Sequence, residues 1–191
     1  MSEDQRLRIG IIMGSTRPGR VNEAVARWTL EHARARTEVD FELVDLLDFH
    51  LPLLDEPIPP SAGRYSKPHS LAWAAKVASF DGYIFVTPEY THGPPAALKN
   101  AIDFVYAEWN NKAAGFVSYG SVGGVRAVEQ LRLNLAEQQV ATVRSQVWFL
   151  LSTDFEDYTK FRPNPAKARM MESMLDQLIA WSGALRSLRS K

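Results

Sequence analysis

A loop near the start of the chain combines glycine, hydroxyl and arginine residues in a pattern suited to binding an anion. The segment Gly14–Asn22 reads Gly-Ser-Thr-Arg-Pro-Gly-Arg-Val-Asn. It follows a short apolar run over 7–13 and leads into a segment, 21–36, with apolar residues at helical spacing. The first N–H groups of a helix have no partner within the helix, and the helix dipole favours negative charge there. A strand, loop and helix of this composition therefore predict a phosphate site.

The side chains of this loop support the same interpretation. Ser15 and Thr16 carry hydroxyl groups, and Arg17 with Arg20 could offset the charge of a phosphate dianion. Arginines near the start of a helix oppose its dipole, which is easier to explain if an anion lies between them. The alternative is a capped turn with solvated arginines.

Several other nucleotide and catalytic motifs are missing from the sequence. Arg20-Val21 stands where a P-loop has lysine followed by serine or threonine, and the loop lacks the middle glycine of the dinucleotide fingerprint. The chain has no G-x-S-x-G elbow and no H-E-x-x-H motif, and its histidines do not have ligand spacing. We therefore predict a site for one terminal phosphate, no serine hydrolase activity and no metal site.

A second loop, Thr87–Pro95, could frame a flat ring. It follows a compact apolar run and reads Thr-Pro-Glu-Tyr-Thr-His-Gly-Pro-Pro. Prolines hold the backbone so that its donors and acceptors can pair with the edge of a heteroaromatic ring, while Tyr90 can contact the plane or rim of that ring. A Tyr90 packed in the core is the alternative. His92 is either a proton donor or a surface hydrogen-bonding group.

A third loop, Ser118–Gly124, is rich in glycine. Gly120, Gly123 and Gly124 allow the backbone to approach a ligand closely, so this loop is predicted to form a third wall of the same site. Arg126 follows in the first turn of the next predicted helix. It could pair with a neighbouring carboxylate or meet an anionic ligand.

The elements that must position these loops alternate in type along the chain. Apolar runs predict strands over 7–13, 39–46, 82–87, 112–119 and 140–151, and helical periodicity predicts helices between them and over 166–188. This order is typical of a doubly wound α/β sandwich, a parallel sheet with helices on both faces and ligands at the carboxyl ends of its strands. The three loops should therefore meet at one edge. The proline-rich segment 53–66 is predicted to be a loop that could act as a lid.

The composition is that of one soluble globular domain, which we place over residues 1–191. The 22 basic and 22 acidic residues cancel, so no general basic field would draw nucleic acid or an anionic membrane to the chain. The absence of cysteine excludes disulfides, thiolate nucleophiles and iron–sulfur clusters. Residues 1–8 lack the apolar stretch of a signal peptide and no run is long enough to span a bilayer, so we expect a cytoplasmic protein without membrane insertion.

Taken together and in order, these motifs resemble the NADPH-dependent FMN reductase family. The resemblance covers roughly residues 7–151 and rests on Gly14–Arg20, Pro88–His92, Ala97–Asp103 and Gly123–Ala127. It implies a flavodoxin-like fold with a five-stranded parallel sheet of order 2-1-3-4-5 and FMN at its switch point, an arrangement for which flavodoxin is the standard example.

By position, the resemblance assigns the FMN phosphate to the first loop, the border of the isoalloxazine to the second and the far side of that ring to the third. The implied cofactor contacts are Ser15, Thr16, Arg17, Arg20, Val21, Asn22, Pro88, Glu89, Tyr90, Thr91, Ser118, Tyr119, Gly120, Gly123 and Gly124. Thr91 stands where family members commonly have asparagine, so an amide contact with the flavin would be lost at this position.

The resemblance also implies the activity, an FMN-dependent NAD(P)H oxidoreductase. Hydride would pass from NADPH or NADH to FMN, and electrons from there to a flavin, quinone, azo or metal-ion acceptor, without a catalytic side chain. Arg64 and Arg126 are candidate partners for the extra phosphate of NADPH. A flavodoxin-like electron carrier and a flavin-binding redox sensor are the alternatives. The neutral chain favours the enzyme, because carriers that dock by electrostatics tend to present a face of one charge.

A homodimer or homotetramer is implied as well. Phe104, Tyr106 and Trp109, at the end of the helix after the third strand, could form an apolar contact between copies. The same residues could equally belong to the core of the chain itself.

Overall fold

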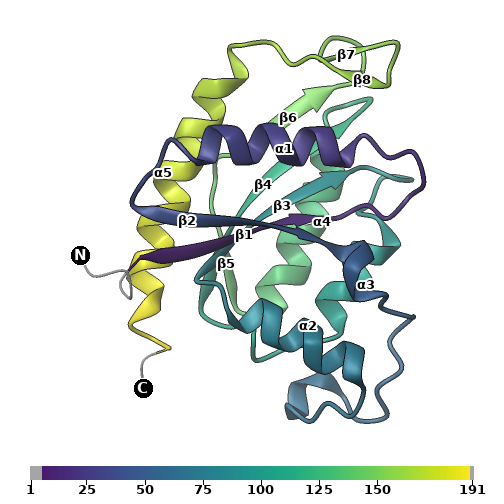
Figure 1. Cartoon of the computed structure of the whole chain (residues 1–191), viewed down its shortest axis with the longest axis vertical. Helices are drawn as coiled ribbons and strands as arrows, with labels where there is room; N and C mark the ends of the chain where they lie inside the picture. The colour runs from purple at the N-terminus through teal and green to yellow at the C-terminus, as the bar shows by residue number, and fades with distance from the viewer. Residues whose placement is uncertain (1–5, 190–191) are drawn as a thin grey trace.

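The computed structural model of the chain describes residues 6–189 and contains one parallel sheet with helices on both sides (Figure 1). In chain order the strands and α-helices are β1 (Leu7–Met13), α1 (Asn22–Ala33), β2 (Val39–Asp45), α2 (Pro68–Ala78), β3 (Gly82–Pro88), α3 (Ala96–Asp103), β4 (Lys112–Gly120), α4 (Val125–Glu137), β5 (Val140–Thr142), β6 (Val147–Leu150), β7 (Phe155–Glu156), β8 (Lys160–Phe161) and α5 (Lys167–Arg186). Short 3-10 helices cover Leu46–Phe49 and Pro60–Ala62.

The sheet has the strand order β2-β1-β3-β4-β5, and all its pairings are parallel. This confirms the flavodoxin-like α/β architecture and the 2-1-3-4-5 order. All strands of a parallel sheet end on the same side of it. The loops after β1, β3 and β4 therefore lie next to one another, at the carboxyl ends of these strands. The segments predicted to hold the ligand are therefore neighbours in space.

The expectation of one continuous strand over 140–151 is wrong. β5 pairs with the start of β4 and β6 pairs with its end, so two short strands share the fifth position and the sheet has six strands. Between them, Ser145 leaves the ladder, and its N–H donates to Oε1 of Gln177 on α5 at 3.0 Å. A side chain from the covering helix thus replaces a strand partner at this point.

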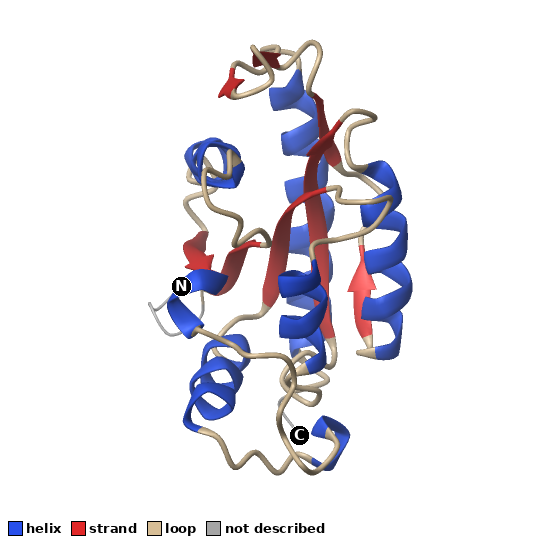
Figure 2. Ribbon diagram, turned by 90° about the vertical axis from the view of Figure 1, so that its right-hand side faces the viewer, coloured by secondary structure: helices blue, strands red, loops and turns tan. Residues whose placement is uncertain are grey.

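Successive residues of the strands face two separate cores, as expected for a sheet that is covered on both sides (Figure 2). Tyr83 and Phe85 of β3 pack with α2, α3 and α4, whereas Ile84 and Val86 pack with α1 and α5. Every residue of β3 and β4 is buried. The predicted core face of the last helix is confirmed, because Met171, Met174, Leu175 and Leu178 are all buried.

Phe104 and Trp109 also belong to the chain's own core. Both are fully buried, and the indole N–H of Trp109 donates to the carbonyl of Ile102 at 3.2 Å. Tyr106 is half-buried. Of the two interpretations of these residues, a contact between copies or the chain's own core, the structure supports the core, because Phe104 and Trp109 have no exposed surface.

The segment 53–66 is a loop, as predicted, but it is tied to its surroundings. Oδ1 of Asn100 on α3 accepts from the N–H of Leu54 at 3.0 Å, and Glu56 accepts from the N–H groups of Ser66 and Lys67 at 3.0 and 2.9 Å. In residues 6–189, no helix is both long enough and apolar enough to cross a membrane.

Candidate functional site

The loop between β1 and α1 is fixed to the end of β3 by hydrogen bonds of its own. The N–H of Gly14 and Nδ2 of Asn22 both donate to the carbonyl of Val86, at 2.9 and 3.0 Å. Asn22 is fully buried. It therefore holds the loop in place through the backbone and has no atom exposed to a ligand.

The start of α1 is open to an anion. Val21 precedes the helix and no side chain caps it, so the first N–H groups of α1 receive no side-chain acceptor. Gly19 in the same loop has φ +68°, and nothing lies within 4 Å of the place where a Cβ would stand. The backbone of this loop thus has both donors and open space in front of them.

The two arginines of the loop have different partners. Arg20 forms a bidentate ion pair with Asp45 at the end of β2, with Nη1 to Oδ1 at 2.9 Å, and it also donates to the carbonyl of Ser15. Its charge is therefore offset within the chain. Arg17 is exposed and has no carboxylate partner among residues 6–189, so it is the cation of this loop that remains for an anionic ligand.

Tyr90 connects the second loop to the first. Its hydroxyl lies 2.9 Å from Oγ of Ser15 and accepts from Nε of Arg17 at 3.3 Å. The side chain is half-buried at the site and does not pack in the core. The interpretation of Tyr90 as part of a ligand site is thus supported by its position, since it touches the same groups that a phosphate would need.

The segment Tyr90–Gly93 forms a tight turn. The N–H of Tyr90 donates to the carbonyl of Gly93 at 2.9 Å and the N–H of Gly93 to that of Tyr90 at 3.0 Å, while Thr91 and His92 have φ +50° and +64°. His92 is exposed, and its carbonyl accepts from Nε2 of Gln130 at 2.6 Å. His92 is therefore a surface residue of the turn, tied to α4 through its backbone.

Glu89 and Arg126 join the second loop to the start of α4. Oε1 of Glu89 accepts from Nε of Arg126 at 2.6 Å, and Oε2 accepts from the N–H of Arg126 at 3.1 Å. The Glu89 side chain is 6% exposed. Arg126 thus has a carboxylate partner, and that carboxylate also satisfies a free donor of the helix. Glu89 can meet a ligand only through its backbone or its stem.

The third loop brings its backbone close to the ends of β3 and β4. Gly124 has φ +73°, and a Cβ at this position would lie 2.9 Å from the N and O atoms of Tyr119. Oγ of Ser118 is buried and donates to the carbonyl of Gly123 at 2.6 Å. The pKa of Tyr119 is raised, chiefly by burial, so its hydroxyl stays neutral. Only glycine fits this turn, because a side chain there would collide with the backbone of the chain itself. The approach of this loop to a ligand stays a prediction.

A cavity of about 150 Å³ lies where these segments meet. It is lined by Arg17, Gly19, Val21, Pro88, Glu89, Tyr90, Tyr119, Gly120, Leu151, Tyr158 and Thr159. Thr16 instead lines a separate cavity of about 160 Å³ beside the 3-10 helix after β2 and the start of α3. The last three residues of the first cavity were not predicted from the sequence.

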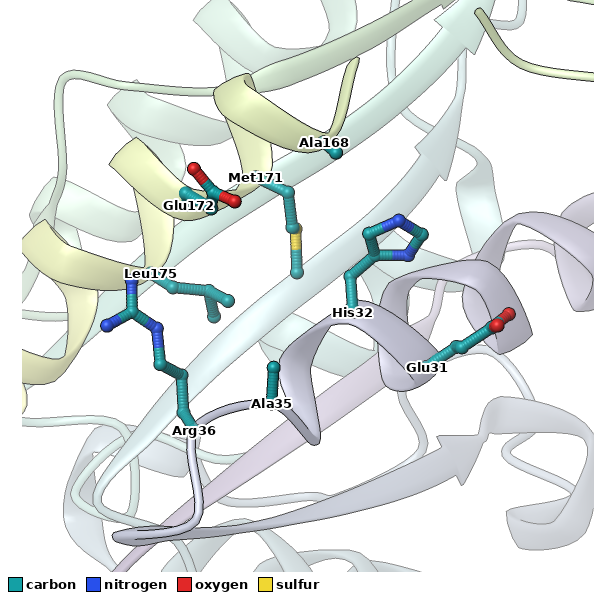
Figure 3. A pocket seen from close by; sticks show the side chains of 8 residues that line it. All are labelled: Glu31, His32, Ala35, Arg36, Ala168, Met171, Glu172 and Leu175. Atoms are coloured by element: carbon teal, nitrogen blue, oxygen red, sulfur yellow. The ribbon is translucent and has the colours of Figure 1, made fainter. Parts of the chain in front are cut away.

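A larger hollow of about 500 Å³ lies elsewhere, between α1 and α5 (Figure 3). It is lined by Glu31, His32, Ala35, Arg36, Ala168, Met171, Glu172 and Leu175. These residues come from the end of α1 that is remote from the phosphate loop, and Arg36 is already paired with Asp176 at 2.5 Å. No group of metal-ligating side chains occurs there or elsewhere in the described part of the chain. The convergent polar groups are thus at the strand ends and not in the hollow between α1 and α5.

The groups at the strand ends fit FMN. The cofactor needs an anion site for its phosphate and a close backbone wall for a flat ring. Arg17 and the uncapped start of α1 offer the first, and the backbone at Gly120, which lines the cavity, offers the second. Fold and site together define a flavodoxin-like protein that binds a mononucleotide.

Comparison with known proteins identifies the family. The sequence pattern of the NADPH-dependent FMN reductase family matches residues 7–154. A protein named NAD(P)H-dependent FMN reductase from Schizosaccharomyces pombe is 45% identical over 127 residues, which is 65% of this chain and 64% of that protein. The quinone reductase of Escherichia coli K12 is 33% identical over 134 residues, 67% of this chain and 69% of the relative. The chain belongs to the NADPH-dependent FMN reductase family.

A solved structure supports the fold in the same way. The flavoenzyme NAD(P)H:(acceptor) oxidoreductase of Paracoccus denitrificans superimposes with a TM-score of 0.71 at 18% identity, covering 93% of this chain and 98% of that one. The chain thus has the flavodoxin-like fold that its sequence predicts.

Proposed function

We propose that the chain transfers hydride from NAD(P)H to an FMN bound across the loops after β1, β3 and β4, and electrons from there to a small-molecule acceptor. The observation that carries this proposal is the convergence of an unpaired Arg17, Val21 at the uncapped start of α1 and Gly120 of the third loop around one cavity. These are the donor groups and the shape that FMN requires.

The side chains of the site divide into those that bind and those that position. Arg17 and the first N–H groups of α1 would hold the phosphate, and the hydroxyl of Ser15, which is fully buried beside Tyr90, would join them only after Tyr90 moves. Arg20, Asn22, Glu89 and Ser118 act indirectly, because each is already bonded within the chain and fixes a loop. The backbones of Pro88–Thr91 and Gly120–Gly124 would border the isoalloxazine.

Bound FMN supplies the redox chemistry, since it can accept a hydride and pass on electrons singly or in pairs. The chain contributes binding, orientation and the local field. Ser15 must be released from the hydroxyl of Tyr90 before it can reach a phosphate, whereas Arg17 gives that hydroxyl only its Nε and has other N–H donors to offer. We therefore expect the Tyr90 side chain to shift when FMN binds.

For the acceptor we propose a quinone. The support is the similarity to the quinone reductase of E. coli, which is 33% identical over two thirds of this chain. Flavins, azo compounds and metal ions are the other acceptors to assay. The same assay measures the preference for NADPH or NADH. Arg64 is the candidate partner for the extra phosphate of NADPH, because Arg64 is exposed whereas Arg126 is paired with Glu89.

We further propose that residues 1–191 form one domain and that the protein is a homo-oligomer. The single domain is supported by α5, which lies beyond the residues 7–154 that match the family pattern and packs against β4, β1 and α1 within them. The homo-oligomer rests on the resemblance to the family. Light scattering that gave the mass of one chain would exclude the oligomer. The cytoplasmic location stays a prediction.

The proposed activity is tested by loading the protein with FMN, removing the excess and adding NADPH or NADH without oxygen in a stopped-flow spectrometer. Rapid loss of flavin absorbance, followed by its return when a quinone is added, would support the enzyme. Retained flavin that neither nucleotide bleaches would favour the electron carrier or the redox sensor.

A further inference from the structure

The hairpin formed by β7 and β8 stands apart from the parallel sheet. It follows β6 at the carboxyl edge, where the candidate site lies (Figure 1), and its strands pair antiparallel through Phe155 with Phe161 and Glu156 with Lys160. The match to the family pattern ends at residue 154, so the hairpin lies just beyond the part that this chain shares with that pattern. It is therefore a feature of this chain to be explained separately.

The base of the hairpin is anchored in the core. Asp154 is 1% exposed, and its carboxylate accepts from the N–H groups of Leu150 and Asn164 at 2.9 and 3.0 Å. The ring of Phe155 lies 5.9 Å from that of Tyr119 and 5.1 Å from that of Phe161. These contacts fix the hairpin relative to β4, the strand that carries the third loop of the site.

The tip of the hairpin reaches the cavity that contains Arg17. Tyr158 and Thr159 line this cavity together with Arg17 and Gly19 of the phosphate loop. Asp157 and Tyr158 both have left-handed backbones, with φ +50° and +59°. They are the two central residues of the turn that the N–H of Thr159 closes by donating to the carbonyl of Glu156 at 3.1 Å, and a tight hairpin turn of this kind requires positive φ at both. Tyr158 is nevertheless 67% exposed, so packing within the chain does not explain its position.

We propose that the tip of the β7–β8 hairpin forms the outer wall of the FMN site and that Tyr158 determines how tightly FMN is retained. The inference rests on the proposed function, because the ligand is the FMN that Arg17 would hold. Since Arg17 and Gly19 belong to the phosphate loop, the part of FMN beside Tyr158 is the phosphate and the ribityl chain. An aromatic ring placed there excludes water from the ion pair of Arg17 with the phosphate and so strengthens it.

The test is the dissociation constant of FMN, measured by the quenching of its fluorescence on binding, with no turnover involved. Tyr158→Ala should raise the constant about tenfold, because an aromatic contact with the ligand that contributes about 1.4 kcal/mol would be lost. Tyr158→Phe, which keeps the ring, should bind as the wild type does. Asp157→Ala is the matched control, since it alters the same left-handed turn at an exposed residue that does not line the cavity.

The role of the hairpin would be overturned if Tyr158→Ala bound FMN as tightly as the wild type while Arg17→Ala bound it more weakly. The proposed function would then still stand. An equal loss in Asp157→Ala would also overturn it, because the turn and not the ring would then matter. A wild-type protein that does not bind FMN at all would contradict the proposed function and the inference together.

Discussion

Arg17 and Arg20 differ in charge balance although they stand three positions apart in one loop. Arg20 is held by Asp45 and by the carbonyl of Ser15, whereas the guanidinium of Arg17 touches only the hydroxyl of Tyr90 among the groups for which the structure gives a contact. A buried ion pair fixes the loop but contributes no net charge to a ligand. The sequence indicates both arginines as phosphate ligands. It does not reveal the pairing of Arg20, because Asp45 lies on a different strand, 25 residues away.

This difference can be measured on FMN affinity. Arg17→Ala should raise the dissociation constant of FMN by about tenfold to a hundredfold, because a charge-assisted hydrogen bond to phosphate contributes about 1.5–3 kcal/mol. Lys99→Ala removes a lysine whose partner is Asp103, at 2.7 Å on α3, and should leave the constant unchanged. Equal effects of the two variants would mean that the phosphate lies elsewhere.

Thr91 is a β-branched residue in a left-handed conformation, with φ +50°. Such residues are outliers there, while asparagine adopts this region readily. Thr91→Asn should therefore stabilise the protein by about 1 kcal/mol in urea unfolding without FMN. A variant that is less stable than the wild type would show that the Thr91 side chain makes a contact worth more than the backbone strain.

At the scale of elements, the long and strongly apolar segments are predictable and the short ones are not. The buried runs of β3 and β4 and the amphipathic α5 have a periodicity that indicates their type. The break between β5 and β6 depends on Gln177 of α5, and β7 and β8 have two residues each, too few to show any period. The hairpin wall of the site was missed for this reason. Only the aromatic residues Phe155, Tyr158 and Phe161 hinted at it.

The turn before α4 is the element for which glycine is most needed. Gly124→Ala should destabilise the fold by more than about 2 kcal/mol, because a left-handed alanine costs about 1 kcal/mol and its Cβ would also meet the backbone of Tyr119. Gly63→Ala is the matched control: φ is +64°, but nothing lies within 4 Å, so the cost should stay near 1 kcal/mol. Equal losses in urea unfolding would mean that the loop shifts freely.

Lys112 joins the end of α2 to the start of β4 and makes stability depend on pH. It is 3% exposed, and Nζ donates to the carbonyl of Val77 at 2.8 Å and to the hydroxyl of Tyr83 at 2.9 Å. Burial, aided by the charge of Arg189, lowers the pKa of Lys112 from its ordinary 10.5 to about 7. The unfolded chain therefore binds more protons than the folded one between these values, and stability should rise with pH across this range.

Urea unfolding at pH 6 to 10 would show this rise in the wild type. Lys112→Met should flatten it, whereas Lys76→Met, which removes a partly exposed lysine paired with Glu42, should not. Above about pH 10 the trend should reverse, because burial raises the pKa of Tyr83 and only the unfolded chain then loses that proton. A slope that survives in Lys112→Met would assign the pH dependence to other groups.

In the whole molecule, all the proposed ligand chemistry lies at one edge of the sheet, where the strands end. Three loops that are far apart in sequence meet there with the β7–β8 hairpin, while the hollow between α1 and α5 lies away from them. The doubly wound topology explains this, because the carboxyl ends of parallel strands share an edge. The location of the site thus follows from strand order, which the sequence predicts. Its outer wall follows from local packing, which the sequence does not reveal.

Hydrogen exchange of the backbone amides with and without FMN tests this location most directly. We expect FMN to slow exchange in residues 14–22, 88–93, 119–124 and 155–161, because a bound ligand suppresses local opening of the segments that it contacts. Exchange at the opposite edge, around Lys112, should not change. Protection confined to residues 31–36 and 168–175 would place the flavin in the hollow of Figure 3 and contradict the account.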